Sequence, residues 1–354
     1  MPEAAELFER VVSRHPSDVA AHEAFGVALV SRAASEGDAE KARADRLYAR
    51  RELLRARELG DTSDLCQILL AQIPETGEVG PLSERPEVDT ALQAGEAAFA
   101  KADWQAAIAA YSRAWDLGHS SRAALYLGDT YFGMKEMDHA GEWFAKAIEV
   151  EPNVETPYRY WGDALMAQGK IREARAKYIE GIVADPYETA SLAGLRKWLI
   201  ANNLSWKKIP IALPPAPSVG KDGKTTISVD GAMLEKPDAS AAWLVYSAER
   251  AQWQKDEFVK KFPQEKTYRH SLTEEVVALT EVVLVYRELA AGEASKRDPA
   301  LELLAKFRDE DLLESFVLLT HADAGIVRDY APYRDTHRDK LIVFLDRYLV
   351  PPAP

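Results

Sequence analysis

The chain has 354 residues, of which 47% are hydrophobic and 29% charged, the balance of an ordinary globular protein and not of a disordered or collagen-like one. Its length exceeds what one hydrophobic core usually serves, so more than one folded unit is expected. The 44 Lys and Arg residues face 57 Asp and Glu residues, and the net charge of -13 argues against nucleic acid or an anionic membrane surface as a partner. The single cysteine, Cys66, excludes an intrachain disulfide and a cysteine-rich zinc site.

The first residues have the pattern of the second helix of a helical hairpin. An alanine, an aromatic residue and a proline stand four and eight residues apart at the start of the chain and again further along: Ala4, Phe8 and Pro16, then Ala140, Phe144 and Pro152. This pattern predicts that the first helix of the hairpin has been trimmed away or comes from an upstream segment. The start lacks the features of a secretory signal and no apolar run could span a bilayer, so the chain as given is predicted to be soluble. The predicted location is cytoplasmic, or periplasmic or secreted if an upstream signal has been removed.

The regular spacing continues to Gly26, ten residues after Pro16, and the pattern becomes looser from there to residue 87. A charged helix is predicted over 38–59 and a short helix over 63–73. Glycine, proline and glutamate are frequent over 74–86, which indicates a loop. Residues 1–87 are therefore expected to form divergent or partial repeats.

Residues 88–188 repeat small, aromatic and proline residues with a period of 33 or 34 residues. Small residues let two antiparallel helices approach closely, an aromatic residue fills the space between them, and a proline without an NH group ends the pair. Each period is thus predicted to be one helical hairpin, and stacked hairpins bury a continuous core. The recurring positions are Gly95, Gly128 and Gly162; Ala107, Ala140 and Ala174; Tyr111, Phe144 and Tyr178; Ala114, Ala147 and Gly181; and Pro152 and Pro186.

This order and spacing resemble the tetratricopeptide repeat family. The resemblance implies an all-α fold, an α-solenoid of helical hairpins followed by a smaller helical domain. Three regular units and a capping helix, expected over 188–202, would occupy 88–204. The resemblance also implies a protein-binding scaffold, because the first helix of each hairpin in this family lines a concave groove that receives a peptide or a partner helix.

The predicted groove is aromatic and largely acidic. The asparagine position of the Lys/Asn/Arg clamp, with which some family members hold a terminal carboxylate, is acidic in all three units, which argues against such a clamp. A neutral or basic protein or peptide with aromatic or aliphatic anchors suits these side chains better. The alternative is that the aromatic residues simply pack against neighbouring helices. By register, the groove residues are Glu96, Phe99, Tyr126, Asp129, Phe132, Arg159, Tyr160, Asp163 and Met166, with Lys197 from the capping helix.

Residues 205–240 are rich in proline and glycine, which predicts a linker with room for one short hairpin. Long amphipathic helices return over 241–354, which is expected to form a helical domain without a 34-residue period. At its start Trp243, Tyr246 and Trp253 are spaced to form one buried stripe.

Further helices follow in this second half. One is predicted over 273–289, with Ser271 or Thr273 as its cap. The others are expected over 301–307, 312–320 and 340–349. Residues 242–272 look like the carboxyl-terminal part of uncharacterised bacterial tetratricopeptide proteins, a resemblance that implies no known activity.

Two groups of side chains are the best candidates for chemistry. Neither group has the spacing of a known site. The first group can equally be a hydrogen-bonded network at the start of a helix. In the second group the two side chains are two residues apart, and such side chains point in different directions on a helix. No nucleophile, zinc, phosphate-loop or dinucleotide motif occurs, so no catalytic, cofactor-binding or metal-binding residue is predicted. The two groups are Tyr268, Arg269 and His270 beside Glu274 and Glu275, and His321 with Asp323.

Three functions remain open. The leading hypothesis is a protein–protein interaction scaffold that is not an enzyme. The first alternative is an enzyme whose active site lies in the second half, marked by a pocket that gathers His270, Arg269 and a carboxylate. The second is self-assembly through the open half-repeat at the start, which light scattering with and without an added upstream helix would test; a monomer in both cases would exclude it.

Overall fold

The computed structural model describes residues 2–36, 38–77, 83, 85–219, 225–226, 239–292 and 297–354. The fold is all-α, and over these residues every element longer than two residues is a helix. The chain divides into two compact units, Met1–Pro152 and Asn153–Pro354, called unit 1 and unit 2 below. This division falls inside the predicted repeat array, whereas the predicted linker over 205–240 lies within unit 2.

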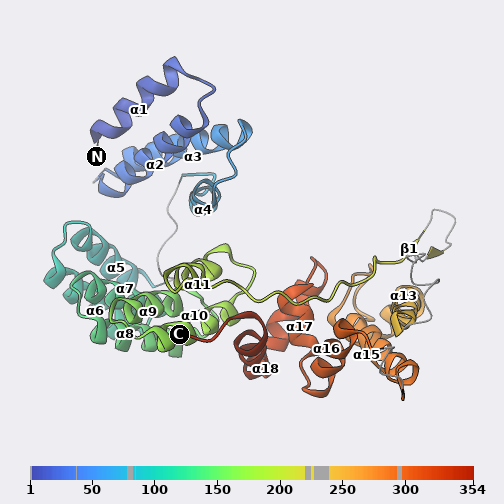
Figure 1. The fold of residues 1–354 in the computed structure, drawn as a ribbon. Coiled ribbons are helices and arrows are strands. Elements are labelled where there is room, and N and C mark those ends of the chain that lie inside the picture. Colours follow the sequence, from blue (N-terminus) through green and yellow to red (C-terminus); the bar gives the residue numbers. More distant parts are fainter. Residues whose placement is uncertain are drawn as a thin grey trace. The chain divides into compact units, whose positions relative to one another are not determined.

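The first four helices of unit 1 form a core of their own (Figure 1). Asp18, Asp38 and Ser63 start the second, third and fourth helix by accepting hydrogen bonds from backbone NH groups of the first turn. The helices predicted over 38–59 and 63–73 are confirmed. The four are α1 (Pro2–Arg14), α2 (Val19–Ser35), α3 (Ala39–Glu58) and α4 (Asp64–Gln72).

The next four helices of unit 1 form two hairpins (Figure 1). The first helix of each hairpin packs along the second, and the two hairpins meet where the second helix contacts the third. Their shared core contains Leu92, Tyr111 and Leu127. The four helices are α5 (Pro86–Phe99), α6 (Trp104–Gly118), α7 (Ser121–Gly133) and α8 (Met137–Val150).

In each of these hairpins the recurring glycine lies against the recurring aromatic ring. A Cβ atom at Gly95 would lie 2.2 Å from the Tyr111 ring, and one at Gly128 would lie 2.4 Å from the Phe144 ring. Both rings are buried. A glycine is required at these positions because no space is left for a side chain between the helices.

Unit 2 begins with a third hairpin and one further helix: α9 (Thr156–Ala167), α10 (Ile171–Ala184) and α11 (Thr189–Ala201). A Cβ atom at Gly162 on α9 would lie 2.4 Å from the Tyr178 ring. Gly194 on α11 is as close, at 2.5 Å, so the Tyr178 ring is held between two glycines. The predicted helix over 188–202 is therefore confirmed, and it occupies the place of the first helix of another hairpin.

The turn after each of these first helices also repeats, although its sequence does not. Ala102, Lys135, Gly169 and Asn203 all have positive φ angles, of 55°, 65°, 71° and 59°. In each case the next residue donates its NH to the carbonyl five residues earlier, at 2.9 to 3.0 Å. This hydrogen bond is typical of a helix that ends in a left-handed residue. The helix end imposes the conformation here, because alanine, lysine, glycine and asparagine all adopt it.

The carboxyl-terminal helices of unit 2 begin with the predicted buried stripe: Trp243, Tyr246 and Trp253 are all buried, which confirms it. The Ser271 hydroxyl accepts a hydrogen bond from the Glu274 NH group and caps α15. The elements are η1 (Ala239–Ala242), α13 (Trp243–Gln252), η2 (Trp253–Glu257), α14 (Phe258–Lys261), α15 (Leu272–Leu289), α16 (Pro299–Asp309), α17 (Leu313–Thr320), η4 (Ile326–Asp329), α18 (Tyr330–Phe344) and η5 (Leu345–Leu349).

The last long helix starts earlier than predicted. A helix was expected over 340–349, but α18 begins at Tyr330. Pro332 does not prevent this, because it stands in the first turn, where backbone NH groups have no partner within the helix. The backbone departs from helical geometry at His337, whose ring stacks on the Tyr333 ring with the centroids 4.6 Å apart.

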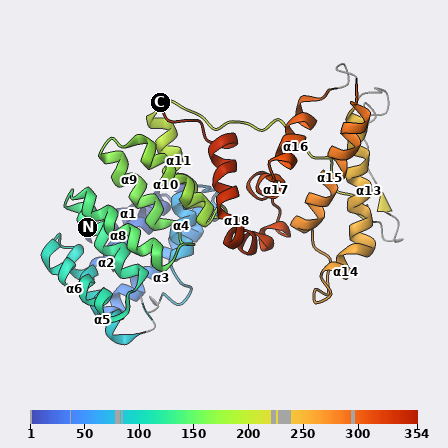
Figure 2. The ribbon, with the colours of Figure 1, turned by 90° about the horizontal axis from the view of Figure 1, so that it is seen from below.

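The helices of 241–354 share one hydrophobic core with α9, α10 and α11. Figure 2 shows α18 beside α10. The Tyr330 hydroxyl donates to the Val183 carbonyl at 2.7 Å, and the Arg334 guanidinium donates to the Ala184 carbonyl at 2.7 Å. These bonds satisfy carbonyl groups at the end of α10, where a cation is favoured.

The segment over 205–217 is extended and joins the same core through Ile211, which is buried. The Lys207 NH group donates to the Leu349 carbonyl at 2.9 Å. Strand β1 (Ser218–Val219) then pairs antiparallel with β2 (Thr225–Thr226), so the short hairpin is present, while the rest of the predicted linker over 220–238 lies largely outside the described residues. None of the described helices is both long enough and apolar enough to cross a membrane.

Candidate binding surface on the first helices

All ten predicted groove residues lie on the first helices α5, α7 and α9 or on α11. Eight of them are half-buried, and Glu96 and Lys197 are exposed, so all ten keep some contact with solvent. On each helix they are three or four residues apart, or directly adjacent, which places them on one side. Glu96, Phe99, Tyr126, Asp129 and Phe132 belong to unit 1; the other five belong to unit 2.

The unit 1 part of this surface contains two carboxyl groups, Glu96 and Asp129, called the acidic pair below. Although Glu96 is exposed as a whole residue, partial desolvation of its carboxyl group raises the pKa of Glu96; the negative charge of Asp129 adds to this rise, while Arg122 opposes it. The Tyr111 hydroxyl donates to Glu96 Oε1 at 3.3 Å, and the Tyr126 ring lies 5.2 Å from the Tyr111 ring. The acidic pair is thus set among aromatic rings.

Asp129 differs from its neighbour because it makes no hydrogen bond or ion pair with any described residue. Burial alone raises the pKa of this carboxyl group. A partly buried carboxylate without a partner has lost water contacts and gained nothing in return. A cation in contact with this carboxylate would compensate for the lost water contacts.

The unit 2 part of the surface is already neutralised by its own contacts. Asp163, which has the register of Asp129, accepts a hydrogen bond from the Tyr178 hydroxyl at 2.7 Å and lies 4.0 Å from Lys197 Nζ. Arg159 donates to the Glu155 carboxylate at 3.0 Å and stacks over the Tyr160 ring. Asp163, Arg159 and Lys197 thus each have a charged partner within unit 2, whereas Asp129 in unit 1 has none among the described residues.

Some of the predicted residues pack as core residues, as the alternative interpretation expects. Phe99 contacts Trp104 edge to face, with the ring centroids 5.4 Å apart, and packs against the unit 1 core. Tyr126 packs against the same core, and Met166 packs against the core of unit 2. Their packed sides therefore support the fold, and the rest of each side chain keeps some contact with solvent.

The predicted group around His270 is gathered into a charged network in unit 2, in which Glu274 and Glu275 are buried and Asp323 is exposed. His270 Nδ1 lies 2.8 Å from Asp323 Oδ2, and His270 Nε2 lies 2.8 Å from Glu275 Oε2. The Tyr246 hydroxyl donates to the second oxygen of Glu275 at 2.7 Å. Both ring nitrogens of His270 are therefore occupied, and Asp323 is paired with His270, whereas nothing in the described residues joins it to His321.

The same network continues through Arg250, which sequence reasoning missed. Arg250 Nε lies 3.3 Å from Glu274 Oε1 and 3.7 Å from Glu275 Oε2. The Tyr268 hydroxyl also donates to Glu274 Oε1, at 2.8 Å. Burial raises the pKa of Glu274, whose other oxygen has no partner among the described residues. A signal was present, because Arg250 has the helical spacing of the buried stripe formed by Trp243, Tyr246 and Trp253.

Arg269 connects the segment before α15 to Gly325 and to Asp329 at the end of η4. Its guanidinium donates to both oxygens of Asp329, at 2.7 and 2.8 Å, and to Glu265 and the Gly325 carbonyl at 3.0 to 3.1 Å. The described residues contain no group of His, Cys, Asp and Glu side chains suited to hold a metal ion. Arg250, Arg269 and His270 each face at least one carboxylate in this arrangement.

His270 makes the stability of unit 2 depend on pH. Burial by itself lowers the pKa of His270, and Arg250 acts in the same direction, but Glu275 and Asp323 outweigh both and raise it above 6.5. The stabilisation from charged His270 is complete below the pKa of the unfolded chain and is lost as pH rises through the folded pKa. We expect the urea midpoint of the unchanged chain, measured relative to that of His270→Gln, to fall between pH 5.5 and 9. Equal slopes would contradict the assignment.

A scan against models of protein families gives no match to this chain, and a search of curated proteins gives none either.

Proposed function

We propose that this protein is an interaction scaffold of the tetratricopeptide type whose unit 1 surface binds a basic side chain of a partner protein or peptide. The observation that carries this proposal is the unpaired, partly buried carboxyl group of Asp129 beside Glu96. A lysine or arginine from a partner would pair with both members of the acidic pair. Its mechanism is recognition without chemical change.

The surroundings of the acidic pair suit a cation with an aliphatic stem. The half-buried Tyr126 lies on the same side of α7 as Asp129, and aromatic rings attract cations; Tyr111 is buried and contributes its hydroxyl, which donates to Glu96. The net charge of -13 favours approach of a basic partner over an acidic one. A neutral segment that carries one or two basic residues is the ligand that these features favour.

The repeated hairpin geometry supports the family part of the proposal. The same glycine-to-ring contact recurs in the pairs Gly95 with Tyr111, Gly128 with Phe144 and Gly162 with Tyr178. The left-handed turn recurs with the same period. Helical pairs stacked at a period near 34 residues are the structural unit that the tetratricopeptide resemblance implies.

The acidic pair is tested by exchanging one carboxyl group for an amide. We expect Asp129→Asn to weaken the binding of a lysine-containing peptide, selected from an array, by about tenfold or more, because a desolvated ion pair is lost. The matched control is Asp163→Asn at the same register, where Lys197 and Tyr178 already satisfy the carboxylate. Fluorescence anisotropy with the labelled peptide and its Lys→Gln version measures both.

The control should lose no more than about twofold, because Lys197 and the Tyr178 hydroxyl already satisfy the Asp163 carboxylate. Equal losses in Asp129→Asn and Asp163→Asn would contradict the assignment to the acidic pair. An array in which only acidic peptides bind would contradict the proposal as a whole.

A further inference from the structure

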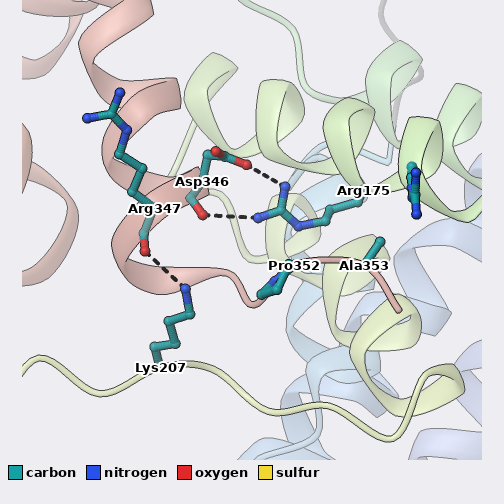
Figure 3. A pocket seen from close by; sticks show the side chains of 7 residues that line it. Arg175, Lys207, Asp346, Arg347, Pro352 and Ala353 are labelled. Atoms are coloured by element: carbon teal, nitrogen blue, oxygen red, sulfur yellow. Dashed lines mark hydrogen bonds and ion pairs between the residues drawn. The ribbon is translucent and has the colours of Figure 1, made fainter.

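A cavity of about 580 Å³ in unit 2 is surrounded by positive side chains (Figure 3). Arg172 and Arg175 line it from α10, Lys207 from the extended segment over 205–217, and Arg347 from η5. Among the described residues, Asp346 is the only acidic one that lines the cavity. Four cations thus converge from three distant parts of a chain whose net charge is -13.

Arg175 lines this cavity, and its guanidinium group is fully used in hydrogen bonds to other residues of the chain. Its guanidinium donates to the Asp346 carboxylate at 2.5 Å and to the Asp346 and Val350 carbonyls at 3.1 and 3.0 Å. Its Nε atom donates to the Pro351 carbonyl at 2.8 Å. All three nitrogens are therefore used to hold the carboxyl-terminal segment against α10, which keeps the cavity in shape.

The other three cations remain available to a ligand. Arg172 is exposed and makes no hydrogen bond or ion pair with the residues that the structure describes. Lys207 Nζ donates to the Arg347 carbonyl at 3.0 Å, which leaves two of its protons free and brings its charge towards Arg347 (Figure 3). The Arg347 guanidinium is mostly exposed, and its one carboxylate neighbour, Glu310, lies 3.5 Å away.

We propose that this cationic pocket binds a small molecule with two or more anionic groups. Like charges held together repel one another, and a bound anion removes that repulsion. Guanidinium groups present paired NH donors that match phosphate and carboxylate oxygens, and the ammonium group of Lys207 adds a point charge. The cavity volume accommodates a metabolite larger than a single inorganic ion.

Isothermal titration of the full chain with pyrophosphate and, separately, with citrate tests the pocket at constant ionic strength, because salt screens exposed charges. We expect saturable binding of at least one of the two with a stoichiometry of one. In the double variant Arg172→Ala/Arg347→Ala, affinity should fall about tenfold or more, because two charge-assisted contacts are removed. The double variant keeps Arg175 and Asp346 and hence the wall of the cavity.

The matched control is Arg10→Ala/Arg14→Ala, which removes the same charge from two exposed arginines one turn apart on α1. It should bind as the unchanged chain does. Binding of pyrophosphate alone would assign the ligand to phosphorylated molecules, and binding of citrate alone would assign it to polycarboxylates. Absence of saturable binding to both anions, or equal affinity in the two double variants, would overturn the proposal.

Discussion

Replacing Arg250 by methionine is expected to lower the free energy of unfolding of unit 2 by about 3–5 kcal/mol, because it removes the guanidinium that buried Glu274 and Glu275 share and leaves Glu275 with His270 as its remaining cationic partner. Arg250 is 6% exposed, and its partners Glu274 and Glu275 are 0% and 1% exposed. Methionine fills much of the same volume, so the loss reports on charge. Urea unfolding followed by tryptophan fluorescence measures it, since Trp243 and Trp253 flank Arg250.

The loss in Arg250→Met should become smaller as pH falls, because burial raises the pKa of Glu274 and protonation then neutralises this carboxyl group. The control is Arg287→Met on α15, which breaks an ion pair with Asp309 in which both side chains are largely exposed. That change should cost no more than about 1 kcal/mol. A loss in Arg250→Met that equals the control, or that does not vary with pH, would show that the network contributes little.

Replacing Gly128 by alanine is expected to destabilise unit 1 by about 1–3 kcal/mol, since the new methyl group overpacks the contact with Phe144. The Phe144 ring is 0% exposed and cannot turn away into solvent. The expected direction is opposite to the usual one, because alanine in a helix is otherwise more favourable than glycine. Thermal unfolding of the full chain, followed by circular dichroism, measures the change in midpoint.

Gly133 provides the control on the same helix. A Cβ atom there would meet its nearest neighbour, Trp104, at 3.2 Å, and the residue is exposed. Gly133→Ala should therefore be neutral or stabilising by up to about 1 kcal/mol. Adding Phe144→Leu to Gly128→Ala should cost less than the sum of the two single changes, because both act on one contact. Additive losses would contradict the packing argument.

The repeated hairpins could be predicted because their signals are local and periodic. Gly128 and Phe144 are 16 residues apart in the sequence, and a pattern that recurs three times can be recognised without knowledge of the rest of the fold. Helix caps such as Ser271 are equally local. The predicted start of α18 was too late, because the apolar pattern near Pro332 is weak. A proline is tolerated only in the first turn of a helix, so its position is informative only once the start of the helix is known.

The division into units could not be predicted in this way. Residues 205–217 read as a linker, yet Ile211 is buried and Lys207 is bonded to the backbone of η5. These contacts join segments about 140 residues apart, as the Lys207 to Arg347 bond does. Proline-rich composition indicates an extended backbone, and it carries no information about what that backbone packs against.

The sequence by itself determined the helices, their pairing into hairpins and the residues that the first helices expose, because these follow from spacing along a regular helix. Only the tertiary structure decided which charges are open to a partner. Asp129 and Asp163 have the same register, but Lys197 lies beside Asp163, whereas Asp129 makes no ion pair with a described residue. Arg250 and His270 likewise acquire their roles from partners on other helices. The availability of a charge depends on through-space neighbours, and these are fixed only when distant segments meet.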